Sequence, residues 1–216
     1  MRLRPPEPPA ALREVHDLAA HLAALDPEDR ELTGLRVTGP VGEKVDLSGF
    51  ALRGVRFEGC RFAATRFARA DLADVVFKGC DVSNCDFSST SWVRCQMEGG
   101  KAMGANFSGG ALWHTLFLQT NLRYANLDDL RLESVAFDGC DLSEAYLTQG
   151  QNKGLAFFEC KLFRTSFFKT KLAGVDVTTC EMEAITVSDD FSELRGLKVT
   201  PFQAADLARM LGIIIS

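Results

Sequence analysis

A five-residue period runs through most of the chain and limits its fold more than any other feature. Large apolar residues occupy almost every fifth position from Leu47 to Leu197, as in "FEGCRFAATRF", where Phe57, Phe62 and Phe67 are five residues apart. A helix would repeat at 3.6 residues and a flat strand at two. We therefore expect a chain that turns a corner after each five residues.

A second series of small or β-branched residues lies two positions before these centres, as at Val55, Cys60 and Thr65. In an extended segment, residues two apart share a face, so both series point the same way. The remaining positions, such as Glu58 and Gly59, are polar or glycine and suit a tight turn. Each pentapeptide is therefore predicted to form one short side of a coil.

Residue types also repeat at a step of twenty, which indicates that four pentapeptides close one coil. The aromatic column contains Phe57, Phe77, Phe117, Phe137 and Phe157, and the cysteine column contains Cys60, Cys80, Cys140, Cys160 and Cys180. Coils that stack at the inter-strand spacing of about 4.8 Å would give residues 32–199 about eight coils and a rod roughly 40 Å long.

Three predicted centres are not large and apolar: Ala102, Asn152 and Ser192. A buried Asn152 is costly unless it is hydrogen-bonded, and the flanking Gly150 and Gly154 allow the backbone to bulge or bend. We expect a local distortion at Asn152 and the end of the coil at Ser192.

The segments "ARADLADVVF", "NLRYANLDDL" and "GCDLSEAYL" resemble the A(D/N)LXX pattern of the pentapeptide-repeat proteins. This resemblance implies an all-β solenoid, specifically a right-handed quadrilateral β-helix. The four sides agree with the step of twenty, whereas the handedness rests on the resemblance alone.

All seven cysteines, which include Cys85 and Cys95, stand at the inward position two before a centre. Their spacing would allow disulfides, but their exchange with Val, Ala and Thr favours small apolar filler. A zinc site needs four converging ligands, and His16, His21 and His114 are not placed to supply them. We expect no metal and no cofactor.

Other classes of function are disfavoured by composition and pattern. The chain has no Gly-rich phosphate loop, HExxH or GxSxG motif, and a rod with a filled interior has no desolvated cleft, so we expect no enzyme. The net charge of −5 argues against direct nucleic-acid binding. No apolar run approaches the roughly 20 residues needed to span a bilayer, so we expect a cytoplasmic protein that does not enter membranes.

The start of the chain, residues 1–31, combines a proline-rich segment with a predicted amphipathic helix over residues 9–25. Its apolar stripe contains Leu12, Val15, Leu18, Ala19, Leu22 and Leu25. We expect this helix to cap the open first coil, and a docking helix for a partner is the alternative.

The end of the chain, residues 200–216, is predicted to form a helix and an apolar tail, because Thr200, Pro201 and Gln203 suit a helix start. It resembles the C-terminal segment of the Qnr and MfpA types of pentapeptide-repeat protein, where such a helix joins two rods. The resemblance implies a homodimer through Phe202, Leu207, Met210, Leu211, Ile213, Ile214 and Ile215.

The same relatives bind DNA gyrase, with a rod thought to imitate duplex DNA, so the resemblance implies gyrase binding and protection from quinolones or toxins. The densest acidic group here is Asp128, Asp129, Glu133, Asp138, Asp141 and Glu144. It lies on adjoining sides of about one coil and is interrupted by Arg131, and the outward charges as a whole are nearly balanced. The uninterrupted count leaves no room for inserted loops, so the likeness is to loop-free relatives.

The alternative is a protein-interaction scaffold with a partner other than gyrase. Phe158, Phe163 and Phe168 each follow an inward centre and are predicted to point outward on three successive sides. Trp113, Leu116 and Leu118 repeat this feature two coils earlier. Outward aromatic clusters are typical of contact surfaces, although a terminal helix that covers them is an equal alternative.

Overall fold

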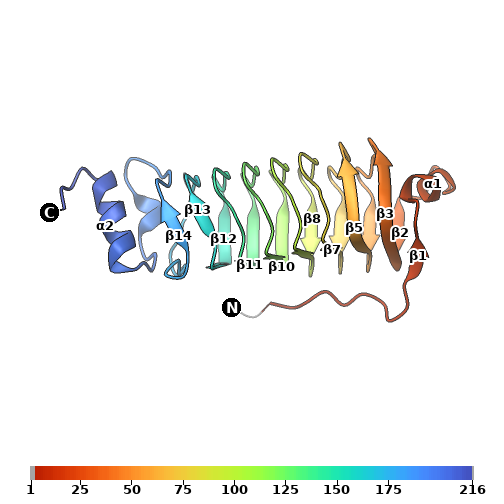
Figure 1. The fold of residues 1–216 in the computed structure, drawn as a ribbon, viewed down its shortest axis with the longest axis horizontal. Coiled ribbons are helices and arrows are strands. Elements are labelled where there is room, and N and C mark those ends of the chain that lie inside the picture. Colours follow the sequence, from red (N-terminus) through yellow and green to blue (C-terminus); the bar gives the residue numbers. More distant parts are fainter. Residues whose placement is uncertain (1–2, 216) are drawn as a thin grey trace.

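The computed structural model describes residues 3–215 as a rod in which short parallel strands lie across the long axis (Figure 1). Neighbouring strands are hydrogen-bonded side by side along the rod. They are β1 Arg13–Val15, β2 Glu31–Thr33, β3 Leu35–Glu43, β4 Ala51–Arg53, β5 Arg56–Ala63, β6 Asp71–Ala73, β7 Val76–Lys78, β8 Ser91–Val93, β9 Gln96–Glu98, β10 Ala111–Leu118, β11 Arg131–Asp138, β12 Gln151–Phe158, β13 Lys161–Phe163 and β14 Glu181–Glu183.

Between Glu31 and Thr186 the strand register repeats every twenty residues, apart from a shift at Pro40, and so confirms the four-sided coil. Phe117 in β10 pairs with Phe137 in β11, which pairs with Phe157 in β12. Single bridges repeat the same step on the other sides, as from Asp86 to Asn106. The predicted fold class, a quadrilateral β-helix with a short helix at each end, is confirmed.

We number the four sides by their inward columns, in chain order. Side 1 contains Leu52, Leu72, Trp92 and Leu112; side 2 contains Phe57, Phe77, Met97 and Phe117; side 3 contains Phe62, Val82, Ala102 and Leu122; side 4 contains Phe67, Phe87, Phe107 and Leu127.

The interior is a continuous stack of aromatic and aliphatic side chains. Phe67 stacks on Phe87 with ring centroids 4.5 Å apart, and Phe87 stacks on Phe107 at 5.0 Å. Rings from adjoining sides meet edge to face, as Phe57 and Phe62 do at 5.2 Å. The coil spacing of about 4.8 Å suits such stacking, and each buried ring contributes roughly 1.5–3 kcal/mol through the area it removes from water.

The last coil is longer than the sequence pattern predicts. Val177 donates its backbone N–H to Lys198, 21 residues on, whereas the equivalent bond in a regular coil, from Val82 to Lys101, spans 19 residues. The bridge from Asp176 to Lys198 likewise spans 22 residues in place of the regular twenty. The prediction that the five-residue count holds to Leu197 is therefore wrong, because two extra residues enter the turn before the 3₁₀ helix η1, Ser192–Leu194.

The distortion predicted at Asn152 is confined to one corner. Its side-chain oxygen accepts from the N–H groups of Gly154 and Leu155, both at 2.9 Å, and its amide donates to the Lys171 carbonyl at 3.2 Å. These bonds satisfy the polar side chain. Gly154 has a φ of 107°, but β12 stays paired with β11 residue by residue, so the strand does not bulge.

The N-terminal helix is shorter than predicted. Residues before Asp17 are extended, and β1 pairs with the edge strand β3, matching Arg13 with Leu35. Helix α1, Leu18–Ala23, then begins after Asp17, whose carboxylate accepts from the Ala20 N–H at 2.9 Å. A helix over residues 9–25 is wrong for its first half, because the open sheet edge offers hydrogen-bond partners that an isolated helical stripe does not. Together β1 and α1 cover the first coil.

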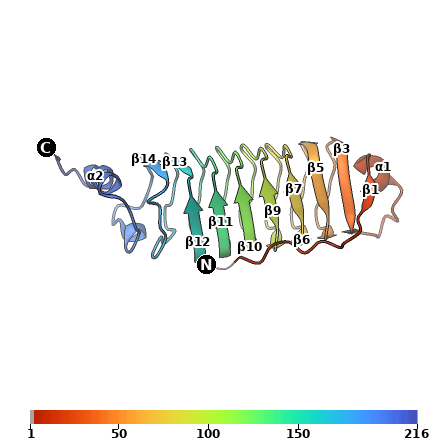
Figure 2. The same ribbon diagram turned by 60° about the horizontal axis from the view of Figure 1, so that its bottom comes forward.

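Residues 3–12, which precede β1, lie alongside the rod, and they extend from β1 back to the level of the middle strands (Figures 1 and 2). Within the described part of the chain, residues 3–10 make one hydrogen bond to the rod, from the Glu7 N–H to Asp74 Oδ1 at 3.0 Å. Residues 3–12 are called the strap below.

The C-terminal helix α2, Pro201–Met210, has the predicted start. The Gln203 N–H donates to Thr200 Oγ1 at 3.2 Å, and the Thr200 N–H donates to Gln203 Oε1 at 2.8 Å. The Gln203 amide also donates to the carbonyls of Val177 and Cys180, at 2.9 and 2.8 Å, and thereby closes the last coil. Within residues 3–215, no helix is long and apolar enough to cross a membrane.

Candidate interaction surfaces

The cysteines are part of the interior wall. All seven are buried free thiols, and six of them, all but Cys180, donate to backbone carbonyls, as Cys85 does to Phe62 at 3.2 Å. Burial raises the pKa of the Cys85 and Cys95 thiols to about 12, so neither forms a thiolate near neutral pH. The prediction of small apolar filler is confirmed. In the described part of the chain, no cluster of three or more His, Cys, Asp or Glu side chains could hold a metal ion.

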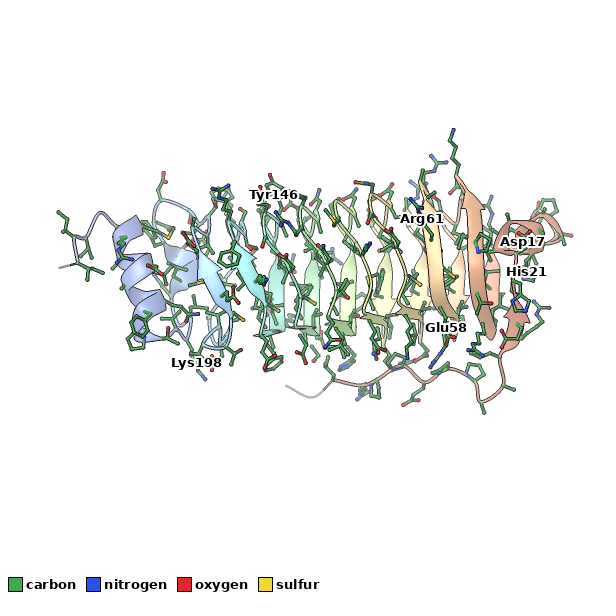
Figure 3. All side chains as sticks on the ribbon, viewed as in Figure 1. Asp17, His21, Glu58, Arg61, Tyr146 and Lys198 are labelled. Atoms are coloured by element: carbon green, nitrogen blue, oxygen red, sulfur yellow. The ribbon has the colours of Figure 1, made fainter. Side chains whose placement is uncertain are left out.

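The outward positions carry the polar and charged side chains. Arg61 and Tyr146 project from one edge of the rod, and Glu58 and Lys198 project from the opposite edge (Figure 3). Any recognition surface must be assembled from such positions in successive coils, because the inward positions are filled.

The six acidic residues singled out in the sequence do not come together. Each side of the coil receives one or two of them: Asp128 and Asp129 on side 4, Glu133 on side 1, Asp138 on side 2, and Asp141 and Glu144 on side 3. They ring the rod, so a flat partner would meet at most one or two at a time. A role for this group in binding stays a prediction.

Half of these carboxylates are also engaged within the rod. Asp128 accepts from the Thr148 hydroxyl at 2.6 Å, and Asp141 accepts from the Ser143 hydroxyl at 2.5 Å. Glu144 lies 3.4 Å from a guanidinium nitrogen of Arg123. These bonds neutralise or orient the charge and leave less of it for a partner.

The three outward phenylalanines are likewise divided among sides. Phe158 on side 2 is 48% exposed and Phe168 on side 4 is 37% exposed, while Phe163 on side 3 is half-buried. The Lys169 ammonium lies 5.1 Å from the Phe168 ring centroid. The structure therefore confirms that they point outward but does not bring them into one cluster. Their role in binding stays a prediction.

Phe158 belongs instead to a surface that the sequence reasoning missed, which we call the side 2 strip. Its outward column places Leu118 between Glu98 and Asp138, and Phe158 follows Asp138. In the neighbouring column Leu116 pairs with Ala136, which is buried, and Ala136 pairs with Ala156. The described outward residues of side 2 from Gln96 to Glu159 include no Lys or Arg. Comparing outward positions twenty residues apart in the sequence would have revealed this strip. It runs across strands β9 to β12, which lie side by side in Figure 2.

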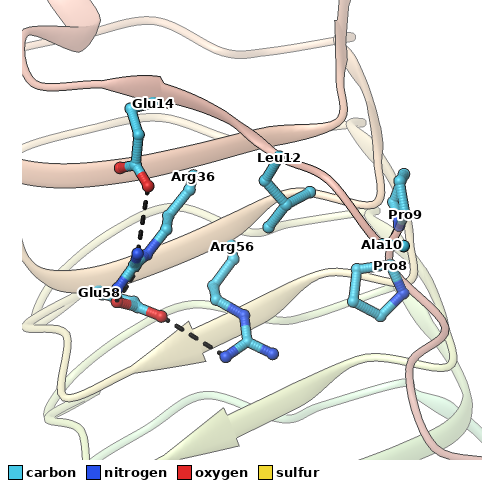
Figure 4. A pocket seen from close by; sticks show the side chains of 8 residues that line it. All are labelled: Pro8, Pro9, Ala10, Leu12, Glu14, Arg36, Arg56 and Glu58. Carbon is cyan, nitrogen blue, oxygen red and sulfur yellow. Dashed lines mark hydrogen bonds and ion pairs between the residues drawn. The ribbon is translucent and has the colours of Figure 1, made fainter.

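Near the N-terminus, side 2 has a different character because it contains an ion-pair network (Figure 4). Arg36 lies 2.6 Å from Glu58 and 3.1 Å from Glu14, and Arg56 lies 3.5 Å from Glu58. The hydrogen bond from Arg36 holds the pKa of Glu58 below its usual value. Together with Pro8, Pro9, Ala10 and Leu12 of the strap, these residues line a hollow of about 350 Å³.

The C-terminal segment contains the two most exposed of the large apolar side chains among the described residues. Phe202 is 86% exposed and Ile214 is 94% exposed, and Met210, Leu211, Ile213 and Ile215 are also exposed, whereas Leu207 packs against the core. These residues lie beyond the last coil at the end of the rod (Figure 1). An apolar group of this kind marks a contact surface more often than a scattered apolar residue does.

The repeat and the four-sided coil define a class of protein that the comparisons identify. A family model described as "Pentapeptide repeat region" matches residues 50–128. The quinolone resistance pentapeptide repeat protein QnrB96 of Scandinavium goeteborgense is 30% identical over 133 residues, which cover 54% of this chain but only 60% of QnrB96.

Solved structures extend the likeness along the rod. A trypsin-treated variant of QnrB1, a plasmid-mediated fluoroquinolone resistance protein, is 27% identical, covers 96% of this chain and is itself covered to 98%, with a TM-score of 0.53. Full-length QnrB1 gives 25% identity, coverage of 94% and 99%, and the same TM-score of 0.53. This chain is a pentapeptide-repeat protein, and within that family it resembles the Qnr type.

Proposed function

We propose that this protein acts in quinolone resistance by binding DNA gyrase through its outer surface, without catalysing a reaction. The observation that carries the proposal is the likeness to QnrB1 along nearly the whole rod, which joins a shared fold to 27% identity. A gyrase partner places the protein in the bacterial cytoplasm. A non-catalytic role is supported by the filled interior, in which the side chains of Phe57, Phe87 and Phe117 have no contact with solvent.

The charge of the rod argues for a surface match more than for an electrostatic copy of DNA. A DNA duplex carries about one negative charge per 1.7 Å, and therefore more than about 20 over a rod of roughly 40 Å. The formal net charge of this chain is only −5. We therefore propose that apolar contact supplements shape and charge in binding gyrase.

The side 2 strip is the proposed contact. It combines Leu118 and Phe158 with Glu98 and Asp138 and lacks cations among its described residues, so it suits a gyrase surface that presents apolar and basic side chains. Charged groups of this kind raise the association rate and set orientation, while buried aromatic residues supply most of the affinity.

The second proposed contact joins two copies of the chain. Phe202, Leu211 and Ile214 are exposed and apolar at the end of the rod, and they support a homodimer through α2 and residues 211–215. Light scattering coupled to size exclusion tests this assignment. We expect the mass of a dimer for the unchanged chain and of a monomer for Phe202→Asp/Ile214→Asp. A monomer in both cases contradicts the assignment.

Direct binding tests the gyrase proposal. Purified gyrase is passed over the immobilised protein, and the unchanged chain is compared with Leu118→Glu/Phe158→Glu. The control is Phe168→Glu, which makes the same substitution as Phe158→Glu at an outward Phe on side 4. We expect the double variant to weaken binding by at least about ten-fold, as the loss of two buried apolar contacts implies, and the control to change it by less than about three-fold. Equal weakening by both would contradict the side 2 assignment.

A scaffold with a partner other than gyrase is the second candidate, favoured by the 48% exposure of Phe158. The same binding measurement separates the candidates. Absence of gyrase binding by the unchanged chain would reject the gyrase proposal and favour the scaffold.

A further inference from the structure

The strap follows the corner between sides 1 and 2 in an extended conformation and contains Pro5, Pro6, Pro8 and Pro9. Leu3, Pro6, Pro8 and Leu12 are half-buried, whereas the intervening Arg4 and Glu7 are exposed. A spacing of two to four residues between the buried positions is typical of a polyproline-like segment that presents one edge to a surface. The strap is thus docked along the rod.

The rod presents a shaped track to the strap at the corner positions of three successive coils: Gly34, Gly54 and Asp74. A Cβ atom at position 54 would lie only 2.4 Å from Cδ of Pro9. The proline therefore occupies space that the side chain of any residue other than glycine at this position would need. One coil further, Asp74 accepts from the Glu7 N–H at 3.0 Å. Arg94 holds the Asp74 carboxylate in place with bonds of 2.7 and 2.6 Å.

The composition of the strap suits this track for a physical reason. Prolines have no N–H, so a proline-rich segment can lie on the rod without leaving many donors unsatisfied, and its extended form loses little conformational entropy on docking. The track supplies one acceptor where one remaining donor, the Glu7 N–H, needs it. The hold is slight, because this is the only hydrogen bond between the described residues 3–10 and the rod, and an open hollow remains beside Pro8 and Pro9.

We propose that this corner is a binding track for extended, proline-rich segments of a partner protein, and that the strap occupies it in cis until such a segment displaces it. The strap itself is the evidence for the chemistry of the occupant, because a segment of that composition lies on the track. This inference does not depend on gyrase binding, since the strap contacts the corner at Gly54 and Asp74, whereas Leu118 and Phe158 lie in later coils of side 2.

A fluorescent peptide with the sequence of residues 3–12 tests the proposal by fluorescence anisotropy, with full chains throughout. The strap is released by Pro6→Gly/Pro8→Gly/Pro9→Gly, which makes it flexible. Two further chains add Gly54→Ala or Gly59→Ala to this released variant. Gly54 and Gly59 have matching φ values of 60° and 62°, but a Cβ at Gly59 meets no atom within 4 Å, so the two substitutions share the backbone strain and differ only at the track.

The released variant should bind the peptide at least about ten-fold more tightly than the unchanged chain, as expected if the strap fills the track in more than nine molecules of ten. Gly54→Ala should remove this gain, and Gly59→Ala should preserve it. Equal affinity of the released and unchanged chains would overturn the proposal, and so would no binding to either, or equal losses from the two alanines. A molecular mass that falls on strap release would identify a second copy as the occupant and overturn the assignment to a partner protein.

Discussion

Phe87 provides a direct test of how the rod is held together. It lies on side 4 with no exposed surface, its ring stacks between Phe67 and Phe107, and it meets Trp92 edge to face at 5.5 Å. Phe87→Ala would remove contacts to the coils on both sides at once. In a solenoid each coil contacts only its neighbours, so distant parts of the structure cannot compensate.

The expected cost follows from this geometry. Replacing a buried Phe with Ala typically destabilises a protein by about 3–5 kcal/mol, and we expect the upper half of this range because two stacking contacts are lost together. Phe87→Leu keeps most of the volume and should cost about 1.5 kcal/mol or less. Phe168→Ala, on the outside of the same side, should cost less than about 1 kcal/mol.

Urea unfolding followed by circular dichroism measures these differences, provided that the slope with urea stays the same among the variants. The order Phe87→Ala, Phe87→Leu, Phe168→Ala is the predicted order of decreasing cost. A loss below about 1.5 kcal/mol for Phe87→Ala, or one equal to that of Phe168→Ala, would refute the stacked-core account.

Three further predictions concern the cap and the titrating groups. Thr200→Ala removes the oxygen that accepts from the Gln203 N–H, and it should cost about 0.5–2 kcal/mol and speed hydrogen exchange in α2; exchange no faster than in the unchanged chain would contradict the cap. Burial raises the pKa of Cys85 and Cys95 from 9.0 to about 12, so the unfolded chain loses these protons first and stability should fall as the pH rises from 9 to 12, while a thiol reagent should label these cysteines only on unfolding. Hydrogen bonds from Ser48, and then the contact with Arg66, lower the pKa of Asp46 from 3.8 to about 2. The contribution of Asp46 to the free energy of unfolding is therefore present above pH 3.8 and lost as the pH falls towards 2, and Asp46→Asn should flatten the dependence of stability on pH in that window.

The fold was predictable because the interior of the coil accepts few residue types. Phe57, Phe77 and Phe117 recur at steps of twenty since each must stack on the coil before it, and a pattern imposed at every step can be read without a structure. The two extra residues of the last coil escaped this reading. They enter an exposed turn, where the interior imposes no residue type, and Leu197 happens to keep the count.

The ends of the chain and the surfaces were less predictable because they depend on contacts between residues far apart in sequence. Val15 and Leu18 fit a helical stripe, but pairing with β3 makes Arg13–Val15 a strand. Likewise Gly54 looks like any other corner glycine until Pro9 is found against it. The side 2 strip was within reach of the sequence, since its outward columns have the same step of twenty as the core.

The measurement that tests the proposed function most directly is supercoiling of relaxed DNA by purified gyrase at an inhibitory concentration of a quinolone, with increasing amounts of this protein. We predict that the protein restores supercoiling in proportion to its concentration, and that Leu118→Glu/Phe158→Glu restores less than the unchanged chain or Phe168→Glu. Neither protection nor inhibition of gyrase at any concentration of the unchanged protein would contradict the proposal that this rod acts on gyrase.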